Sequence, residues 1–264
     1  MASLLLLAGC LSNNDAMNDD TTEKTTEMST TTPTPNNKTG CMLCDAELEY
    51  LDSPRDLRCE ICGNVYVSDV WCANHHYVCD SCHASDAYEL IASVCRRSKS
   101  KNPVEIAMGL MDHPSVHMHG PEHHVLVGSA LLAAYHNAGG NIDLDSALRE
   151  MRRRGQQVPG GVCGSWGSCG AAISTGMFMS IVTGNSPLKA QEWRLSNHCT
   201  SCALDKIAVH GGPRCCKRDS FLAIVEAVKQ SKEALGVEME LPREVKCHYS
   251  HLNKNCLGKE CPFN

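Results

Sequence analysis

The cysteines constrain the fold of this chain more than any other feature, because 18 of its 264 residues are cysteine. Most of them stand in pairs separated by two residues or next to a histidine. Two cysteines at this spacing can both point at one ion from a tight turn, whereas disulfide frameworks show no preference for repeated short pairs. The chain has only three Phe, three Trp and six Tyr, so metal sites are expected to supply stability that a thin aromatic core does not.

The first 40 residues differ in composition from the rest of the chain. Leu4 to Leu7 followed by Ala8, Gly9 and Cys10 is similar to a lipobox, in which the leader is cleaved before a cysteine that carries lipid. Residues 11–40, rich in Ser, Thr, Asn, Asp and Pro, suit a solvated tether. However, no Lys or Arg precedes the short apolar run, and a secretory leader needs a basic start and about 7 to 15 apolar residues. A membrane-anchored lipoprotein and a disordered tail therefore both remain open.

Two close cysteine pairs follow this leader. Cys41, Cys44, Cys59 and Cys62 form the pattern C-x2-C-x14-C-x2-C, which is close to the spacing of a four-thiolate zinc ribbon. Closed four-ligand sites mostly contribute folding energy and leave no position for a substrate. The same thiolates also bind iron, so a rubredoxin-like centre or an iron-sulfur cluster is the alternative.

A second ligand set comes directly after the first one. It comprises Cys72, either His75 or His76, then Cys79 and Cys82. Eight ligands in four pairs permit two zinc ions, either in consecutive ribbons or in a cross-braced arrangement, and the spacing does not decide between them. We therefore predict a small zinc-ribbon-like cysteine-knuckle domain over residues 41–85, with His76 as the histidine ligand.

Helical periodicity dominates the remainder, residues 86–264, with no strand alternation to support a sheet. Proline near a first turn, acidic starts and glycine stops mark the ends of the segments. The expected helices cover 87–95, 103–111, 123–137, 145–154 and 169–183, then a helix from a Ser186-Pro187 start to 210, and one from a cap at Asp219 or Ser220 to 235. The predicted fold is mostly α, a helical bundle preceded by the cysteine-knuckle domain. No segment approaches the roughly 20 apolar residues of a membrane span.

Five histidines crowd the window before the third of these helices. His113, His117, His119, His123 and His124 lie within twelve residues, broken by two prolines and a glycine. Histidine is a common metal ligand at neutral pH. We predict a metal site with an open position, built from His117, His119, His123 and His124. The alternative is that some of them cap helices or lie at the surface, since the adjacent pair cannot easily face one point.

Glycine-flanked cysteines form another candidate site. Cys163 and Cys169 lie in a Gly-rich stretch, and Cys215 and Cys216 precede the final helix beside Arg214, Lys217 and Arg218. A helix N-terminus and cationic neighbours both lower a thiol pKa and favour the reactive thiolate. We predict that these four cysteines share one catalytic or cluster-binding site. The alternative is close packing of small residues with inert buried thiols.

The remaining cysteines give a third candidate. Cys199 and Cys202 lie within one helical turn and could face one ion. The tail has C-x3-H-x4-C-x4-C spacing and ends in Cys-Pro, which suits a zinc knuckle or a cluster ligand set. Its predicted ligands are Cys247, His251, Cys256 and Cys261.

Four strings carry a family resemblance: residues 120–128 (GPEHHVLVG), 163–176, 211–220 (GGPRCCKRDS) and 250–254 (SHLNK). With them, residues 41–264 resemble a cysteine-rich family of unknown function from methanogenic archaea and anaerobic bacteria, sometimes joined to a methyltransferase domain. The resemblance implies a cytoplasmic location and a methyltransferase or redox protein as partner. A weaker resemblance is to redox proteins named for a C…GCAxxG…C…C pattern, from which Cys169-Gly-Ala-Ala departs.

These patterns lead to two functional hypotheses. The net charge of −6 gives no support to nucleic-acid binding, and no hydrolase triad, phosphate loop or dinucleotide fingerprint is evident. The first hypothesis is a metal-binding redox or sulfur-handling protein of anaerobic metabolism, with zinc and an iron-sulfur cluster as cofactors. The second is a non-catalytic zinc module that serves a methyltransferase or corrinoid system.

Overall fold

The computed structural model describes residues 40–44 and 46–264, and these belong to one compact unit. The predicted lipobox at Cys10 and the polar tether lie outside the described residues. None of the helices in the described part combines the length and apolar character that crossing a bilayer requires.

The first element is a two-stranded antiparallel hairpin. Strand β1, Leu48–Arg58, pairs with β2, Val65–Cys72, from Leu48 opposite Cys72 to Arg58 opposite Val65. Of these residues only Leu57 and Cys72 are buried. Because an isolated two-stranded hairpin is marginally stable in water, this one needs support from outside its own side chains.

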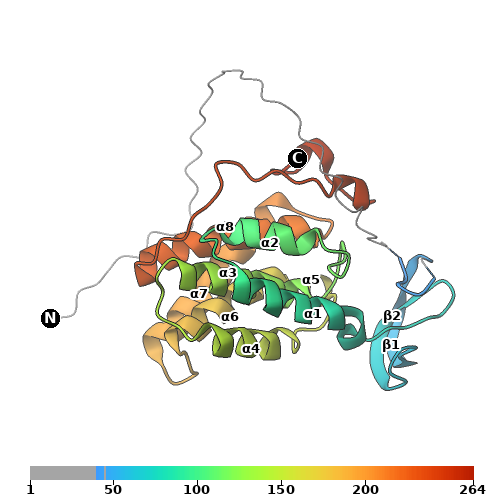
Figure 1. The fold of residues 1–264 in the computed structure, drawn as a ribbon. Helices are drawn as coiled ribbons and strands as arrows, with labels where there is room; N and C mark the ends of the chain where they lie inside the picture. The colour runs from blue at the N-terminus through green and yellow to red at the C-terminus, as the bar shows by residue number, and fades with distance from the viewer. Residues whose placement is uncertain (1–39, 45) are drawn as a thin grey trace. The chain divides into compact units, whose positions relative to one another are not determined.

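Eight α-helices follow in the described part of the chain, and they confirm the mostly α fold class. Figure 1 shows how they are arranged. They are α1 Asp80–Arg97, α2 Pro103–Met111, α3 His123–Asn137, α4 Leu144–Gly155, α5 Val162–Ser165, α6 Gly170–Thr183, α7 Ala190–His210 and α8 Cys216–Leu235. Two short 3-10 helices, η1 Ser250–Leu252 and η2 Gly258–Glu260, lie in the tail. Helix α1 crosses the predicted domain boundary between residues 85 and 86.

The predicted starts of the last two long helices are wrong. Helix α7 begins at Ala190 rather than at the Ser186-Pro187 pair. Helix α8 begins at Cys216, and Cys215 takes the extended cap conformation. Asp219 therefore lies inside the first turn, where its Oδ2 accepts a hydrogen bond of 3.4 Å from the backbone N–H of Cys215. The carboxylate still supports the helix start, but from within the helix.

Helix α3 forms the centre of the bundle, since every residue from His123 to Tyr135 is buried. It packs against α1, α2, α4, α6 and α8. Close approach depends on Gly128, whose backbone N–H donates to Ser174 Oγ at 2.9 Å, and where a Cβ would collide with Met151. Burial of each large apolar side chain around α3 contributes about 1.5–3 kcal/mol.

The tail after α8 packs back onto the bundle. Tyr249 is fully buried, and its hydroxyl donates to Met108 O at 3.2 Å and to Asp112 Oδ1 at 2.7 Å. Phe263 packs edge-to-face on Phe221 with ring centroids 5.5 Å apart. These contacts hold the tail cysteines against α2 and α8.

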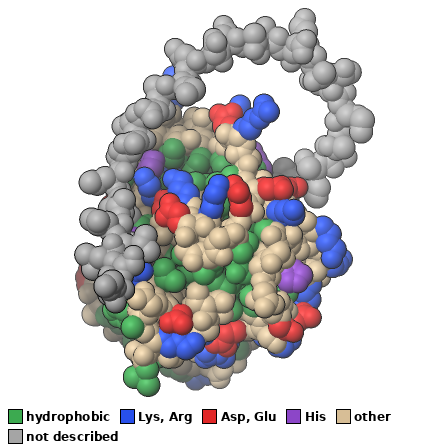
Figure 2. Space-filling model, turned by 90° about the vertical axis from the view of Figure 1, so that its left-hand side faces the viewer, with side chains coloured by type: hydrophobic (Ala, Val, Ile, Leu, Met, Phe, Trp, Pro, Cys, Tyr) green, Lys and Arg blue, Asp and Glu red, His purple; other side chains and the backbone are tan. Residues whose placement is uncertain are grey.

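Charged side chains of both signs are interspersed on the molecular face in Figure 2. Hydrophobic side chains gather in the middle of this face, between the charged ones. A nucleic-acid footprint would instead show clustered Lys and Arg, so this face agrees with the negative net charge.

Candidate metal centres

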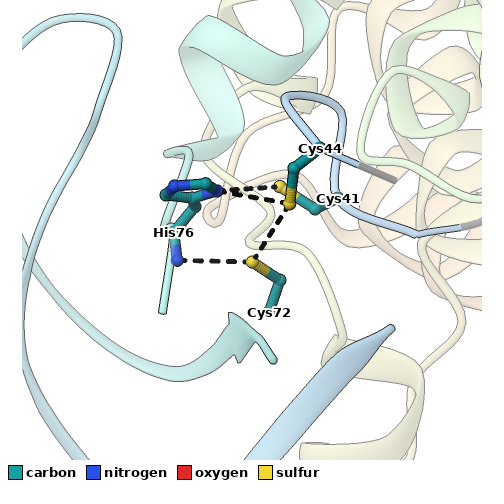
Figure 3. A group of neighbouring side chains, drawn as sticks. All are labelled: Cys41, Cys44, Cys72 and His76. Atoms are coloured by element: carbon teal, nitrogen blue, oxygen red, sulfur yellow. Dashed lines mark hydrogen bonds between the residues drawn. The ribbon is translucent and has the colours of Figure 1, made fainter. Parts of the chain in front are cut away.

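The first ligand group combines residues from both ends of the hairpin sequence. Cys41 and Cys44 precede β1, Cys72 ends β2 and His76 follows it, and Figure 3 shows their side chains converging. Cys44 Sγ lies 3.8 Å from Cys72 Sγ and 3.3 Å from His76 Nδ1, which is 3.9 Å from Cys41 Sγ. A tetrahedral zinc ion about 2.3 Å from sulfur and about 2.0–2.1 Å from nitrogen holds its ligand atoms roughly 3.3–3.8 Å apart. The group therefore fits one zinc ion.

The second ligand group comprises Cys59, Cys62, Cys79 and Cys82, whose sulfur atoms all lie within 4.8 Å of one another. Cys62 Sγ and Cys79 Sγ are 3.9 Å apart. Cys41 and Cys44 thus share a group with Cys72 and His76. Cys59 and Cys62 share the other group with Cys79 and Cys82. This is the cross-braced alternative, and the first four cysteines do not form a ribbon of their own.

The hairpin explains this pairing. Cys59 follows β1 directly, so the 11-residue strand separates it from Cys41 and Cys44. At about 3.3 Å per residue, this distance is far beyond the span of one metal site. Strand β2 then returns, and its register places Cys72 opposite Leu48, at the end where β1 began. We call residues 41–82 the cross-braced module.

Local backbone geometry aims the ligands of the module. The backbone N–H groups of His76 and Cys79 donate to Cys72 Sγ and Cys59 Sγ at 3.3 and 3.4 Å. His75 adopts a φ of 62° and stacks on Trp71, with ring centroids 4.3 Å apart, so His76 is the histidine that faces the cysteines.

Hydrogen bonds favour the thiolate form of two ligands. The pKa of Cys44 is lowered to about 6 by the backbone of Ala46 and the side chain of Asn74. Burial opposes ionisation of Cys59, but hydrogen bonds from the backbone of Cys62 and Cys79 outweigh it and lower its pKa to about 6. Because the thiolate is the metal-binding form, these contacts prepare both residues for an ion.

A third group contains no cysteine. It consists of His83 on α1, His117 from the loop between α2 and α3, and Glu122 at the start of α3. His117 Nδ1 lies 3.4 Å from Glu122 Oε1, and His83 Nδ1 lies 3.9 Å from Glu122 Oε2. Burial alone would raise the pKa of Glu122, but the contact with the His117 side chain and the positive charges that His123 and His83 can carry lower it to about 2. Glu122 is therefore a carboxylate at neutral pH.

Only one histidine of the predicted His-rich site belongs to this group, namely His117. His123 Nδ1 lies 3.1 Å from Gly120 O, and His124 Nδ1 lies 3.0 Å from Val158 O. The two neighbours thus face different partners. His119 is half-buried near Arg214, and desolvation together with that charge lowers its pKa to about 4.

Sequence reasoning missed His83 and Glu122 as members of this group. Both had a usable signal, since His83 follows the ligand Cys82 directly and Glu122 lies inside the histidine window. The exposed His113 takes no part in the three groups found among the described residues.

The four predicted catalytic cysteines lie in two different places. A thiolate at Cys169 would raise the pKa of Cys216, and a thiolate at Cys163 would raise the pKa of Cys169, so these three cysteines lie in one region. Cys215 instead lines a pocket with the tail cysteines. Cys215 has an extended backbone and Cys216 begins α8, and Cys216 does not line this pocket.

The expected low thiol pKa values are wrong for this region. Burial and the charge of Asp219 raise the pKa of Cys169 to about 12. Burial also raises the pKa of Cys216 and of Cys215, despite nearby Arg214 and Arg218. Desolvation of the thiolate therefore outweighs the helix N-terminus and the cations.

The pocket that Cys215 lines contains three of the four predicted tail ligands. We call it the four-cysteine pocket, after Cys215, Cys247, Cys256 and Cys261. The backbone N–H groups of Tyr249 and Gly258 donate to Cys247 Sγ and Cys256 Sγ, both at 3.4 Å. Met118, Arg218, Tyr249, Ser250, Asn253 and Leu257 complete the lining.

Three other predicted ligands lie elsewhere. His251 is exposed and does not line the four-cysteine pocket. Cys199 and Cys202 are buried on α7, and Cys202 Sγ lies 3.6 Å from His198 Nε2. Burial raises the pKa of Cys199 to about 12, which is typical of a packed thiol.

The comparisons with known proteins identify one family. The model of a family of unknown function, DUF5714, matches residues 91–264. No curated protein and no solved structure matches the chain. The match includes His117, Glu122 and the four-cysteine pocket, and it begins after the cross-braced module and His83. Because the match covers more than half of the sequence, the chain belongs to the family of unknown function DUF5714.

Proposed function

We propose that this chain is a redox or sulfur-handling metalloprotein, in which two zinc ions fold the cross-braced module and the four-cysteine pocket holds an iron-sulfur cluster. The observation that carries the proposal is the convergence of Cys215 with Cys247, Cys256 and Cys261 on one pocket. Four cysteine thiolates are the usual ligand set of iron-sulfur clusters.

The spacing of these sulfur atoms favours a cluster over a single zinc ion. Among the described residues, the groups of three or more ligand atoms within 4.8 Å of one another do not include the sulfurs of this pocket. The two zinc-like groups of the module do meet that distance. In a [4Fe–4S] cluster each cysteine binds a different iron, so the four sulfur ligands stand further apart than those around one ion.

The charges around the pocket suit an anionic cofactor. Lys217 is fully buried, with Nζ 5.2 Å from the centroid of the Tyr249 ring and 3.3 Å from Val116 O. A buried ammonium group is costly unless an opposite charge compensates it. The Glu122 carboxylate provides part of that charge, and cluster thiolates at Cys215 and Cys247 would add to it. The N–H···S bonds at Cys247 and Cys256 are of the kind that tunes cluster potentials.

The neighbouring thiols would give such a cluster a reaction partner. A thiolate at Cys169 would raise the pKa of Cys216, so the two thiols lie near each other, and Cys216 is adjacent in sequence to the proposed ligand Cys215. Their raised pKa values keep both thiols protonated until a cofactor or substrate changes their surroundings. A redox or sulfur-handling reaction would use this thiol pair beside the cluster.

Anaerobic purification followed by iron and acid-labile sulfide analysis tests the proposal. We expect a brown protein with about four iron and four sulfide per chain. Cys256→Ser should lose most of both, while the control Cys95→Ala, which changes a buried thiol on α1 outside the pocket, should retain them. A colourless wild-type protein that contains only zinc would refute the cluster.

The second candidate is a non-catalytic accessory module for a methyltransferase or corrinoid protein. It is favoured by apolar side chains exposed on one face of the hairpin, where Val65 is 51% and Val67 73% exposed. Exposed apolar residues of this kind are typical of docking surfaces when they are contiguous. In this case Val65→Ser with Val67→Ser should weaken binding to the methyltransferase, whereas the Cys256→Ser change should leave it unaltered.

A further inference from the structure

We propose that His83, His117 and Glu122 form a third metal centre, which binds one divalent transition-metal ion and leaves a coordination position open to water or a small substrate. One atom from each residue lies within 4.8 Å of the other two. The proposal does not rest on the iron-sulfur cluster, because none of its ligands is a cysteine of the four-cysteine pocket.

Unsatisfied polar atoms give the first argument. His83 Nδ1, His117 Nδ1 and Glu122 Oε2 are all buried and have no hydrogen-bond partner. Buried polar groups are nearly always paired, so each such atom requires an explanation. Three of them from separate segments point to the same place, and a single ion would satisfy all three.

The distances give the second argument. Two ligand atoms that are each about 2.0–2.2 Å from one ion lie no more than about 4.4 Å apart. The separations of 3.4 Å and 3.9 Å between the imidazole nitrogens and the Glu122 carboxylate meet this limit. The two imidazole rings are also neighbours, with centroids 4.2 Å apart.

The surrounding chain aims the carboxylate. Glu122 Oε1 accepts a hydrogen bond of 2.9 Å from the backbone N–H of His117, which leaves Oε2 free. Gly120 provides the space, because a Cβ at this position would collide with the Glu122 carboxylate. A glutamate with no exposed surface is thus held in one orientation by two features of the same loop.

The exposed fractions of the three side chains indicate which side of the proposed ion remains open. The side chain of Glu122 is fully buried, while those of His117 and His83 are 15% and 25% exposed. An ion here would have the carboxylate behind it and the edges of the imidazoles toward solvent. Two histidines and one glutamate are the ligand set of catalytic zinc sites that keep a fourth position for water, whereas structural sites have four protein ligands. The proposed centre therefore differs in kind from the two groups of the module.

Cobalt titration of the whole chain distinguishes this centre from the thiolate sites. Cobalt bound by thiolates gives an intense ultraviolet charge-transfer band, and cobalt at a site of two histidines and a glutamate does not. We expect wild-type protein to bind one more equivalent than Glu122→Gln or His83→Gln, at an equal charge-transfer intensity. The control His113→Gln, in an exposed residue of the same loop, should bind as many ions as wild type.

Two outcomes would overturn the proposal. Equal numbers of bound ions in wild type and Glu122→Gln would mean that the three residues form only an ion-pair cluster. A matching loss of charge-transfer intensity in His83→Gln and Glu122→Gln would assign the missing ion to a thiolate site. Zinc and iron analysis of the protein as purified then identifies the resident ion. Cys256→Ser removes a ligand of the proposed cluster and none of the third centre, so its loss of iron and sulfide does not alter the cobalt result. Failure of the cluster proposal and failure of the third-centre proposal can therefore be distinguished.

Discussion

Cys82 and His83 are consecutive residues in the first turn of α1, yet they belong to different ligand groups. Cys82 completes the second zinc-like group of the module, and His83 faces His117 and Glu122. Filling the second group should therefore fix the position of His83. We expect Cys62→Ser to weaken cobalt binding at the third centre more than Cys44→Ser does, because Cys44 belongs to the other group. Equal effects of the two substitutions would mean that the third centre depends only on the folding of the whole module and not on the second group in particular.

Metal removal should unfold the module before it unfolds the bundle. The hairpin buries little of its own surface, and structural zinc contributes about 10–16 kcal/mol of binding free energy in small zinc domains. Hydrogen exchange with mass spectrometry should show that a strong chelator removes protection from residues 48–72 while α3 stays protected. Simultaneous loss of protection in both regions would contradict this separation.

Buried thiols should resist alkylation in the native protein. The pKa of Cys169 is raised to about 12 by burial and by Asp219. At pH 8 roughly one molecule in ten thousand would carry the thiolate at such a pKa. We expect iodoacetamide to modify Cys169 only after denaturation, as for Cys199, whose pKa burial also raises to about 12. Raising the pH toward 12 in native conditions should speed the reaction, since the thiolate fraction grows. Rapid alkylation of Cys169 in the native protein at pH 8 would contradict the raised pKa and support the reactive thiolate predicted from the sequence.

Tyr249 should matter for the four-cysteine pocket as well as for stability. Tyr249→Phe removes the hydroxyl that bonds Met108 O and Asp112 Oδ1. Loss of a hydrogen bond to a buried or charged group costs about 1–3 kcal/mol of unfolding free energy. Urea unfolding should show this loss, and iron retention should fall if the cluster is present. The exposed Tyr50, changed to Phe, is the control and should leave both unchanged.

Two helical glycines should respond in opposite ways to alanine. Gly128→Ala places a Cβ against Met151 and Ser174 in the centre of the bundle, and overpacking of this kind costs about 1–3 kcal/mol. Gly109→Ala on α2 meets nothing within 4 Å, so the higher helix propensity of alanine should stabilise by about 0.5–1 kcal/mol. Thermal unfolding of both variants measures the contrast. A similar effect of the two substitutions would mean that Met151 and Ser174 do not pack closely against α3 at Gly128.

The sequence predicted the ends of a helix best where residues next to that end determine it. Asn102 accepts hydrogen bonds from Val104 N and Glu105 N and starts α2 beside Pro103, and α3 stops before Gly139 and Gly140. The start of α8 was missed because Asp219 supports it from inside the helix. Residue preferences alone do not separate a cap from a supporting carboxylate one turn further on.

The ligand groups needed information that lies beyond short spacing. The eight ligands of the module could be named from the sequence, but their pairing depends on the length and register of the hairpin. His83 and His117 are separated by the rest of α1 and the whole of α2, so only the packing of α1 against α3 brings them together. The low thiol pKa values failed because burial, a tertiary property, outweighed the local helix terminus.

The hairpin also serves as a spacer between the two ion positions of the module. One group lies where Leu48 faces Cys72, and the other lies beyond the opposite end, where Arg58 faces Val65. His76 of the first group and Cys79 of the second are only three residues apart, and three residues of extended chain span at most about 11 Å. A longer hairpin would pull the two groups apart unless this segment also grew, so the two ion positions are coupled through the chain as well as through the strands.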